Sequence, residues 1–390
     1  MRVLLIRLRL IGDVVLSTPV IRALRRRFPD ATLTYLVERD AAAVVADNPH
    51  LDEVLVVNRT QGLARLGDDL RLAWQLRRRR FDVVIDMHGG PRSSWLTLAT
   101  GAPQRIGYDM PGRQWMYTRT VPRARELRPR HSVLNQWDLL GAIDGWLPEE
   151  AQPARDPVEM PVHPAADRRI AERLRAAGVG EEHELIVLHV SASNPFRRWP
   201  EPAFSEVVAK LAGASSRRRL ILSSGPSDRQ AADRIAEGAR ALLDDRTRSR
   251  VVDFGEFDLA ELRALIGHSR LFIGGDTGPL HVAATTATPV VAVYGPTLPA
   301  RSSPWRDPSI PTEAVEVTGL PCRPCDQRVC APGDYRCLTT LKPADVLAAA
   351  ERALKASERS ERAAGVERGS WGPANDGVGE SEGRNPSGLS

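Results

Sequence analysis

The stretch 271–286, LFIGGDTGPLHVAATT, combines an apolar run, two adjacent glycines and a helical pattern. The apolar run at 271–274 predicts a strand, and residues 278–286 predict a helix. Gly274 and Gly275 let a ligand approach the backbone closely, and the N-terminus of the following helix favours an anion such as phosphate. The stretch therefore predicts a strand–loop–helix unit of an α/β fold whose loop binds an anion.

Two polar residues of this stretch have a structural alternative. The sequence around Asp276 is neither a Walker A motif nor a G-x-G-x-x-G motif, so it specifies no reaction. Asp276 is a good helix cap, and His281 is placed to pack beneath the helix. We favour anion binding because two glycines stand directly at a strand–helix junction.

Short apolar runs alternate with helical patterns on both sides of this stretch. In the second half, predicted strands at 185–190, 219–224, 251–254, 271–274 and 289–294 are separated by predicted helices at 201–213, 228–243, 258–268 and 278–286. In the first half, strands at 3–6, 32–37, 53–57 and 82–87 alternate with helices at 14–27, 40–46 and 64–80. Apolar strands separated by helices indicate a parallel sheet covered on both faces, so each half predicts one doubly wound, Rossmann-like lobe.

Closely spaced prolines separate the two halves. They are Pro148, Pro153, Pro157, Pro161 and Pro164, a spacing that excludes a helix or a central strand. We therefore predict one lobe over residues 1–150, a linker over 151–164 and a second lobe over 165–345, with a cleft between the lobes. A helix over 346–355 and a disordered tail over 356–390, rich in Gly, Ser, Glu and Arg, follow.

Length and composition limit the class of protein. The chain has 390 residues, of which 42% are hydrophobic and 26% charged, which suits two globular domains and excludes a wholly disordered or collagen-like chain. The early charges Arg7, Arg9 and Asp13 leave no run of the roughly 18 to 20 apolar residues that would span a bilayer, and they argue against a signal peptide. We therefore expect a cytoplasmic protein.

The charge of the chain is unevenly distributed. Of its 54 basic residues, only Lys210, Lys342 and Lys355 are lysines, and this imbalance weakens an argument for nucleic acid from the net charge of +5, so no nucleic-acid partner is expected. Residues 1–150 carry 23 Lys and Arg against 17 Asp and Glu, whereas the remainder is nearly neutral. The first lobe is therefore the one that favours an anionic ligand.

A second candidate loop follows the first predicted strand. In the segment Gly12-Asp13-Val14-Val15-Leu16-Ser17-Thr18-Pro19, Asp13 stands at the mouth of a predicted helix. Ligands of open α/β sheets bind beyond the carboxyl ends of the strands, so this loop is well placed for chemistry. The structural alternative is that Asp13 only caps the helix or complements its dipole.

Together these segments resemble the bacterial heptosyltransferases, the glycosyltransferases that build the lipopolysaccharide inner core. The likeness spans roughly residues 1–350 and rests on the opening Gly12-Asp13…Thr18-Pro19, on Ser193…Arg197-Arg198-Trp199-Pro200, and on 275–281 through Pro289 to Pro296. It implies a GT-B fold whose first lobe holds the acceptor and whose second holds the nucleotide-sugar. It also implies inverting transfer of a heptose from ADP-L-glycero-β-D-manno-heptose to Kdo or to the first heptose, on a lipid A-Kdo or heptosylated inner-core acceptor, without a metal or other cofactor.

The resemblance also implies roles for individual residues. Asp13 is the base that takes the acceptor proton, and Arg197 neutralises the leaving ADP, a position at which the family commonly carries Lys. The expected donor-binding residues are Ser193, Arg198, Asp228, Asp276, Thr277, Gly278 and His281. For Trp199 and Pro200 we favour packing at a helix start over ligand contact.

Loop arginines of the first lobe are candidates for the anionic acceptor. Arg92, Arg113 and Arg123 are the expected acceptor-binding residues, although each alone is also consistent with a solvated surface arginine. The run at 77–80 closes a predicted helix, where cations favour the dipole and suit peripheral contact with the anionic inner face of the cytoplasmic membrane.

Four cysteines cluster late in the chain. Cys322, Cys325, Cys330 and Cys337 have the spacing C-x₂-C-x₄-C-x₆-C. We favour reduced structural cysteines, because only the first pair has a familiar ligand spacing, and a structural zinc is the alternative.

Two other functions remain open at this point. The first is a GT-B transferase that uses another nucleotide-sugar or a protein acceptor. The second is a non-catalytic GT-B protein that binds a nucleotide, although such a protein would have no need of a base at Asp13.

Overall fold

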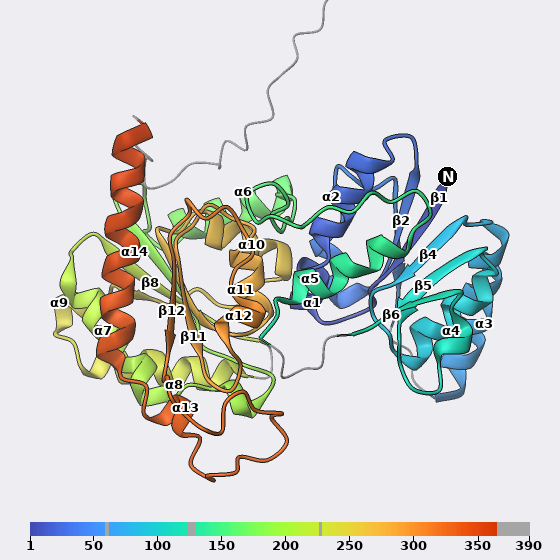
Figure 1. Ribbon diagram of the computed structural model, residues 1–390. Helices are drawn as coiled ribbons and strands as arrows, with labels where there is room; N and C mark the ends of the chain where they lie inside the picture. The colour runs from blue at the N-terminus through green and yellow to red at the C-terminus, as the bar shows by residue number, and fades with distance from the viewer. Residues whose placement is uncertain (59–61, 124–128, 226–227, 365–390) are drawn as a thin grey trace, which may run out of the picture.

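The computed structural model describes residues 1–58, 62–123, 129–225 and 228–364, and these form two α/β lobes that lie side by side (Figure 1). The first lobe contains a six-stranded sheet in the order β3-β2-β1-β4-β5-β6. All its neighbouring strands are parallel. Its strands are β1 (Arg2–Ile6), β2 (Thr32–Glu38), β3 (Glu53–Val57), β4 (Val83–Asp86), β5 (Gln104–Tyr108) and β6 (Arg119–Val121).

The second lobe repeats this architecture with the order β12-β11-β10-β7-β8-β9, again entirely parallel. Its strands are β7 (Glu184–His189), β8 (Arg218–Ser223), β9 (Val251–Val252), β10 (Leu271–Gly275), β11 (Val290–Tyr294) and β12 (Thr312–Glu316). In each lobe the strand order reverses beside the first strand, which is where doubly wound sheets bind their ligands. The predicted GT-B-like architecture of two Rossmann-like lobes is confirmed.

Helices cover both faces of each sheet. In the first lobe they are α1 (Ile11–Val15), α2 (Thr18–Arg27), η1 (Arg39–Val44), α3 (Gly62–Arg78), α4 (Pro91–Thr100), η2 (Gln114–Met116), α5 (Ser132–Trp137) and η3 (Asp138–Ala142). In the second lobe they are α6 (Pro164–Ala176), η4 (Pro195–Arg197), α7 (Glu201–Ala214), α8 (Arg229–Ala241), α9 (Asp245–Arg248), α10 (Leu259–Gly267), α11 (Gly278–Ala283), α12 (Pro299–Ser302), α13 (Arg336–Thr339) and α14 (Pro343–Ala364). None of the described helices is long and apolar enough to cross a membrane.

Alternate residues of the central strands supply separate cores, because successive side chains of a strand point to opposite faces. Leu4 and Ile6 of β1 pack with α3 and α4, whereas Val3 and Leu5 pack with α1 and α2. The second of these cores continues into the other lobe, where it includes residues of α6, α10 and α11. The inner faces of the two lobes therefore share one hydrophobic core.

The segment between the lobes contains no regular element from 144 to 163 and is fixed by polar contacts. Arg22 and Arg26 of α2 form ion pairs with Glu159 and with the fully buried Asp156. The indole of Trp305, in the second lobe, donates to the carbonyl of Asp156 at 2.8 Å. The linker is therefore packed against both lobes.

Two helix predictions need correction. The predicted helix at 14–27 is interrupted, because the hydroxyls of Ser17 and Thr18 bond the carbonyls of Val14 and Val15, and Pro19 stands in the first turn of a new helix, α2. The last helix extends to Ala364, so residues 356–364, predicted as tail, are helical. Arg270 holds this extension through two hydrogen bonds to Glu361, at 2.8 and 3.1 Å. The rest of the predicted tail, 365–390, lies outside the described residues.

Candidate functional site

The loop after β1 places a carboxylate at the edge of the first sheet. Asp13 lies in the first turn of α1, where no side chain caps the helix, and its own side chain is 32% exposed. The buried guanidinium of Arg7 donates to this carboxylate and, at 2.7 Å, to the carbonyl of Met87. Asp13 is thus held by Arg7, the residue that directly follows β1, and it is not a helix cap.

The loop after β4 is fixed by a second, fully buried carboxylate. Asp86 accepts hydrogen bonds from the backbone N–H groups of His88 and Gly89, and from the hydroxyls of Ser93 and Tyr117, at 2.7 to 2.9 Å. Burial raises the pKa of Asp86, and these four donors oppose that effect. Asp86 therefore shapes the loop that carries His88.

His88 lies among the cations of the first lobe. Burial lowers its pKa to about 4, and the charges of Arg7, Arg9 and Arg123 act in the same direction while Asp13 opposes them. The imidazole is therefore neutral at pH 7. The exposed Arg9 lies in the loop between β1 and α1, and Nη1 of the exposed Arg123 would lie 3.8 Å from a Cβ added to Gly89.

The three arginines predicted to bind the acceptor have different surroundings. Arg113 donates to the carbonyl of Gly89 at 3.2 Å, and the guanidinium of Arg123 lies 5.0 Å from the ring centre of Tyr108. Both therefore border the His88 loop. Arg92 instead pairs with Glu38 and Asp69, and its side chain is only 11% exposed. Two carboxylates already engage its guanidinium, so the acceptor-binding role of Arg92 stays a prediction without support from its surroundings.

In the second lobe, a polar network joins the loops after β7 and β8. His189 shares hydrogen bonds with Ser223 at 2.9 Å and Ser191 at 3.2 Å, and the hydroxyl of Ser191 accepts from the N–H of Gly225. Burial lowers the pKa of His189 to about 4, so this network contains a neutral imidazole. It fixes the spacing of two loops that border the predicted donor site.

Three of the predicted donor-binding residues lie on these two loops. Ser193 is exposed, and Arg198 donates to the carbonyl of Ala192 at 2.8 Å and to the carboxylate of Asp228 at 3.0 Å. Asp228 is therefore engaged with Arg198 in this structure. Trp199 packs edge-on against Phe204 and donates to the carbonyl of Leu341, which agrees with the packing role expected for it.

The loop after β10 brings Arg197 and Asp276 together. Arg197 Nη1 donates to the carbonyl of Asp276 at 2.9 Å and lies 3.3 Å from its carboxylate. That carboxylate is 5% exposed and also accepts from Thr297 at 2.6 Å. Thr277 and Gly278 follow at the start of α11, where the Thr277 side chain caps no N–H. Asp276 is thus an anchor for Arg197 and not the helix cap of the alternative interpretation.

The two lobes meet where α1 touches α11. A Cβ added to Gly12 would lie 2.6 Å from Cδ2 of His281, and one added to Gly278 would lie 3.2 Å from Cβ of Ile11. Burial lowers the pKa of His281, while the charges of Asp276 and Asp13 oppose this shift and that of Arg197 reinforces it. The imidazole therefore lies among the charged groups of both lobes, and the structure brings together Asp13, Arg197, Asp276 and His281.

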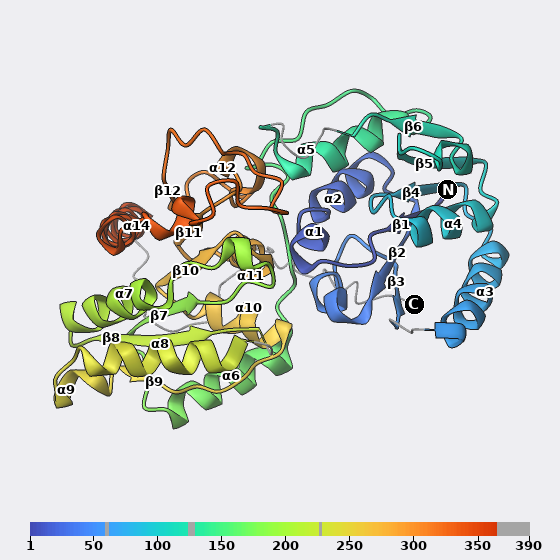
Figure 2. The same ribbon diagram turned by 90° about the horizontal axis from the view of Figure 1, so that it is seen from below.

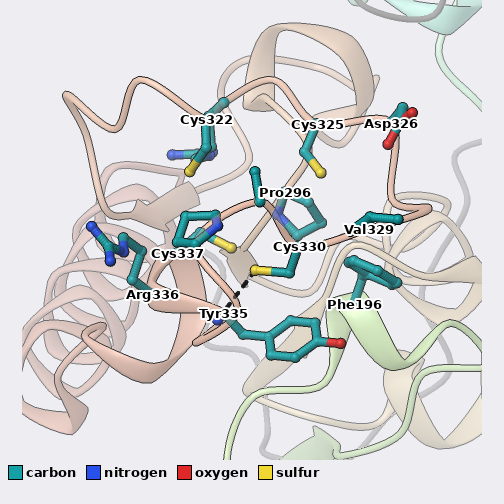
Figure 3. A pocket seen from close by; sticks show the side chains of 13 residues that line it. Phe196, Pro296, Cys322, Cys325, Asp326, Val329, Cys330, Tyr335, Arg336 and Cys337 are labelled. Atoms are coloured by element: carbon teal, nitrogen blue, oxygen red, sulfur yellow. Dashed lines mark hydrogen bonds between the residues drawn. The ribbon is translucent and has the colours of Figure 1, made fainter.

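The cysteines lie on one loop beside this site. Figure 3 shows Cys322, Cys325, Cys330 and Cys337 around a cavity of about 210 Å³ that Phe196 also lines. All four are free thiols. Among the described residues, no group of three or more His, Cys, Asp or Glu side chains is arranged to hold a metal ion. The zinc alternative therefore does not fit the arrangement of these thiols.

Several residues of the site were not predicted from the sequence. Arg7 and His88 each stand just beyond an apolar strand, and a polar residue at that position is the signal that would have indicated them. Gln327 accepts hydrogen bonds from Asn194 and Arg197, which are more than a hundred residues away in sequence. No local pattern indicates such a contact.

The chain is similar in sequence to known proteins over most of its length. The model of glycosyltransferase family 9 (heptosyltransferase) matches residues 70–335. Lipopolysaccharide heptosyltransferase 3 of Escherichia coli is 27% identical over 361 residues, which are 90% of this chain and 98% of that protein.

Two solved structures share the fold. A glycosyl transferase of family 9 from Veillonella parvula has a TM-score of 0.75 and 22% identity, with 91% of this chain and 97% of that chain covered. An Escherichia coli heptosyltransferase solved with ADP-2-deoxy-2-fluoro heptose has a TM-score of 0.65 and 20% identity, with 90% and 99% covered.

Two Rossmann-like lobes that meet through the loops at the carboxyl ends of their strands form the GT-B architecture. The match of the chain to the family model extends over more than half of its length. The chain belongs to glycosyltransferase family 9, the heptosyltransferase family.

Proposed function

We propose that this enzyme transfers a heptose, with inversion, from ADP-L-glycero-β-D-manno-heptose to the lipopolysaccharide inner core. The observation that carries the proposal is the meeting of the lobes at α1 and α11. There Gly12, the neighbour of Asp13, lies against His281 of the second lobe, and Arg197 donates to the carbonyl of Asp276 on the loop that leads into α11. The proposed proton acceptor and the proposed phosphate-binding cation therefore come from the two sides of the lobe boundary.

In the proposed reaction, Asp13 accepts the proton of the acceptor hydroxyl as its oxygen attacks the anomeric carbon. The new carbon–oxygen bond forms on one face of the sugar while the bond to the β-phosphate oxygen of ADP breaks on the other, so the configuration inverts. Arg7 orients the base through its ion pair with Asp13. ADP leaves with the electron pair of the broken bond.

The leaving ADP needs positive charge and hydrogen-bond donors close to its phosphates. We assign these to Arg197 and Arg198, with Thr277 and Gly278 at the start of α11 and Ser193 on the neighbouring loop. The solved relative with an ADP-linked fluoroheptose supports ADP as the nucleotide. Arginine side chains supply charge of the kind that a metal ion would otherwise provide, which supports transfer without a metal.

The acceptor is proposed to be the Kdo or a heptose of a lipid A-linked inner core. Its anionic groups match the cationic edge of the first lobe, formed by Arg9, Arg113 and Arg123 around the neutral His88. The match to a lipopolysaccharide heptosyltransferase over nearly the whole chain supports this acceptor class. We place the reaction at the cytoplasmic face of the inner membrane, where the enzyme is proposed to bind peripherally.

The experiment that tests this proposal is a screen of the purified chain against ADP-heptose, UDP-sugars and GDP-sugars with defined Kdo-bearing and heptosylated acceptors. We expect turnover with ADP-heptose alone, an inverted anomeric centre in the product, and unchanged rates in the presence of a chelator. Turnover with a UDP-sugar and none with ADP-heptose would establish the alternative donor. ADP-sugar binding without turnover on any acceptor would establish the non-catalytic alternative.

A further inference from the structure

The cysteine loop, residues 322–337, does not form a metal cage, but two of its sulfurs have well-defined partners. Sγ of Cys325 accepts the backbone N–H of Gln327 at 3.3 Å, and Sγ of Cys330 accepts that of Tyr335 at 3.4 Å (Figure 3 shows the second bond). Gln327 and Tyr335 both have left-handed backbone conformations, with φ of 58° and 52°. The sulfurs thus hold the two non-glycine residues of this loop whose φ is positive.

These same two residues contact the loop that carries Arg197. The side-chain oxygen of Gln327 accepts from Nδ2 of Asn194 at 2.9 Å and from Nε of Arg197 at 2.8 Å. The ring of Tyr335 packs edge-on against Phe196, with centroids 5.2 Å apart. Gln327 and Tyr335 therefore hold the loop that carries Arg197 at two points.

The contacts of Arg197 define the orientation of its guanidinium. Nε is bound by Gln327, and Nη1 is bound by the carbonyl and carboxylate of Asp276. Nη2 forms no hydrogen bond within the described residues, so two fixed nitrogens leave the third for a ligand. A planar guanidinium held at two points loses little further freedom when it binds a phosphate.

We propose that the cysteine loop is a brace that positions Arg197 for the donor nucleotide, with Gln327 as the positioning residue and Cys325 and Cys330 as its anchors. This rests on the donor-binding role proposed for Arg197. Gln327 itself needs no contact with the sugar or with the acceptor.

The test measures ADP affinity by calorimetry for Gln327→Ala, Arg197→Ala and the double variant. We expect Gln327→Ala to raise the Kd about threefold to tenfold and to raise the KM for the donor more than it lowers kcat. The double variant should bind no more weakly than Arg197→Ala, because Gln327 acts through Arg197. Gln327→Glu keeps the acceptor oxygen and should recover affinity, and the exposed Val329→Ala is the matched control on the same loop.

Substitutions of the anchor residues Cys325 and Cys330 provide a second series of variants. Cys325→Ala and Cys330→Ala should weaken ADP binding in the same direction, whereas Cys322→Ala should not, because its sulfur accepts no N–H from a described residue. Additive effects of Gln327→Ala and Arg197→Ala would overturn the brace, as would stoichiometric metal whose removal by a chelator weakens ADP binding. Unchanged affinity in Arg197→Ala would overturn the proposed donor site itself, and the brace with it.

The outer surface of the first lobe carries a row of exposed apolar side chains on α3. On α3 the side chains of Leu66, Leu70 and Trp74 are 62%, 55% and 59% exposed, and they follow one another at four-residue intervals. This spacing places them in one stripe along the helix. Figure 2 shows α3 at the far side of this lobe from the second lobe.

The stripe ends in a cluster of cations. The guanidinium of Arg78 lies 4.5 Å from the ring centre of Trp74, and the exposed Arg77 and Arg80 follow. Within the described residues none of these three arginines pairs with a carboxylate, in contrast to Arg71, which pairs with Asp68. An apolar stripe with aromatic and arginine side chains matches the interface of an anionic bilayer.

The helix also has a defined relation to the acceptor edge. Because α3 follows β3, the Leu66 end lies near the carboxyl edge of the sheet and the arginine end near the opposite edge. The ion pairs of Arg92 with Asp69 on α3 and with Glu38 at the end of β2 hold this end of the helix in place. A bilayer on the stripe would thus lie beside the loops proposed for a lipid-linked acceptor.

We propose that this exposed face of α3, which we call the α3 stripe, seats the enzyme on anionic lipid. The test is co-sedimentation with vesicles of phosphatidylcholine and phosphatidylglycerol that contain no acceptor, so that the active site contributes nothing. We expect the double variant Leu70→Ser/Trp74→Ser to reduce the vesicle partition coefficient about tenfold, and Arg77→Gln/Arg78→Gln to reduce it by about fivefold for each arginine.

Matched controls lie on the second lobe. Leu242→Ser changes a leucine that is 64% exposed, and Arg246→Gln/Arg248→Gln removes two surface arginines of α9, so both variants should bind vesicles as the parent does. Equal binding by the α3 variants and the parent would overturn the proposal. Self-association of the parent that the Leu70→Ser/Trp74→Ser variant abolishes, without vesicle binding, would instead identify the stripe as an interface between copies.

Discussion

At the residue scale, the site is built from side chains that stand just beyond the ends of parallel strands. Asp13, Asp276 and His281 were predicted because each belongs to a local strand–loop–helix pattern. Arg7 was not predicted as a partner of Asp13, although it stands directly after the strand, because the contact with Asp13 is made by the fold and the same loop carries a second arginine, Arg9. The structure separates the two: Arg7 is buried and paired, whereas Arg9 is exposed.

Arg7 gives a prediction at this scale. Arg7→Gln removes the cation that orients Asp13, so we expect kcat to fall at least about tenfold while the KM for the donor stays within about twofold. Steady-state kinetics with ADP-heptose measures both values. The control is Arg119→Gln, which breaks an exposed ion pair with Asp144 in the same lobe. A donor KM that rises with unchanged kcat would contradict the positioning role.

At the scale of elements, the sequence predicted the central strands and one margin of each sheet, formed by β3 and β9, and missed the other margin. β1, β4, β7 and β10 are almost continuously apolar, as buried parallel strands are. β6 and β12 are edge strands and β5 lies next to β6, and all three contain polar residues that are not fully buried. They therefore lack the continuous apolar run by which the other strands were predicted. Arg92 was assigned to the acceptor because its sequence position is a loop end, and its two carboxylate partners come from other elements.

The contact of α1 with α11 gives a prediction at this scale. Gly12→Ala would place a Cβ 2.6 Å from the buried ring of His281, so the helices must separate. We expect a loss in kcat/KM of more than about tenfold, with a loss of about 1 to 3 kcal/mol in the free energy of unfolding. Kinetics and urea denaturation measure the two effects.

The matched control for this substitution is Gly213→Ala. Its added Cβ would meet nothing within 4 Å in α7, so it should leave transfer unchanged and stabilise the helix slightly. Parental kcat/KM in Gly12→Ala would show that a close α1–α11 contact is not needed for transfer.

At the scale of the whole molecule, buried histidines predict acid sensitivity. Burial lowers the pKa of His131 and His189 to about 4 in the folded chain, against an ordinary value of about 6.5. Between pH 4 and pH 6.5 the unfolded chain binds more protons than the folded chain. The free energy of unfolding therefore decreases as the pH falls from about 6.5 toward 4. Each histidine contributes about 3 kcal/mol to this loss.

Urea denaturation at a series of pH values between 7 and 4 measures this dependence. His189→Gln should show a shallower fall of stability with pH than the parent, because one buried group no longer titrates. A free energy of unfolding that stays constant across this range, in the parent, would contradict the buried neutral state of these histidines.

The two-lobed architecture was predictable from the alternation of strands and helices, and the charge of residues 1–150 indicated the lobe with cationic loops. The meeting of the lobes was not predictable, because Gly12 and His281 are far apart in sequence and no local pattern couples them. The proposed reaction depends on that meeting, since it would bring Asp13, the proposed base, to a donor held by the second lobe.

The most direct test of transfer between the two lobes compares the parent with Asp13→Asn in one assay of heptose transfer from ADP-heptose to defined inner-core acceptors, with the Kd for ADP measured on the same samples. We predict that transfer falls about 10²-fold to 10⁴-fold while the Kd for ADP stays within about twofold, because the proposed base and the proposed nucleotide site lie on different lobes. Transfer by Asp13→Asn at the parental rate would contradict it.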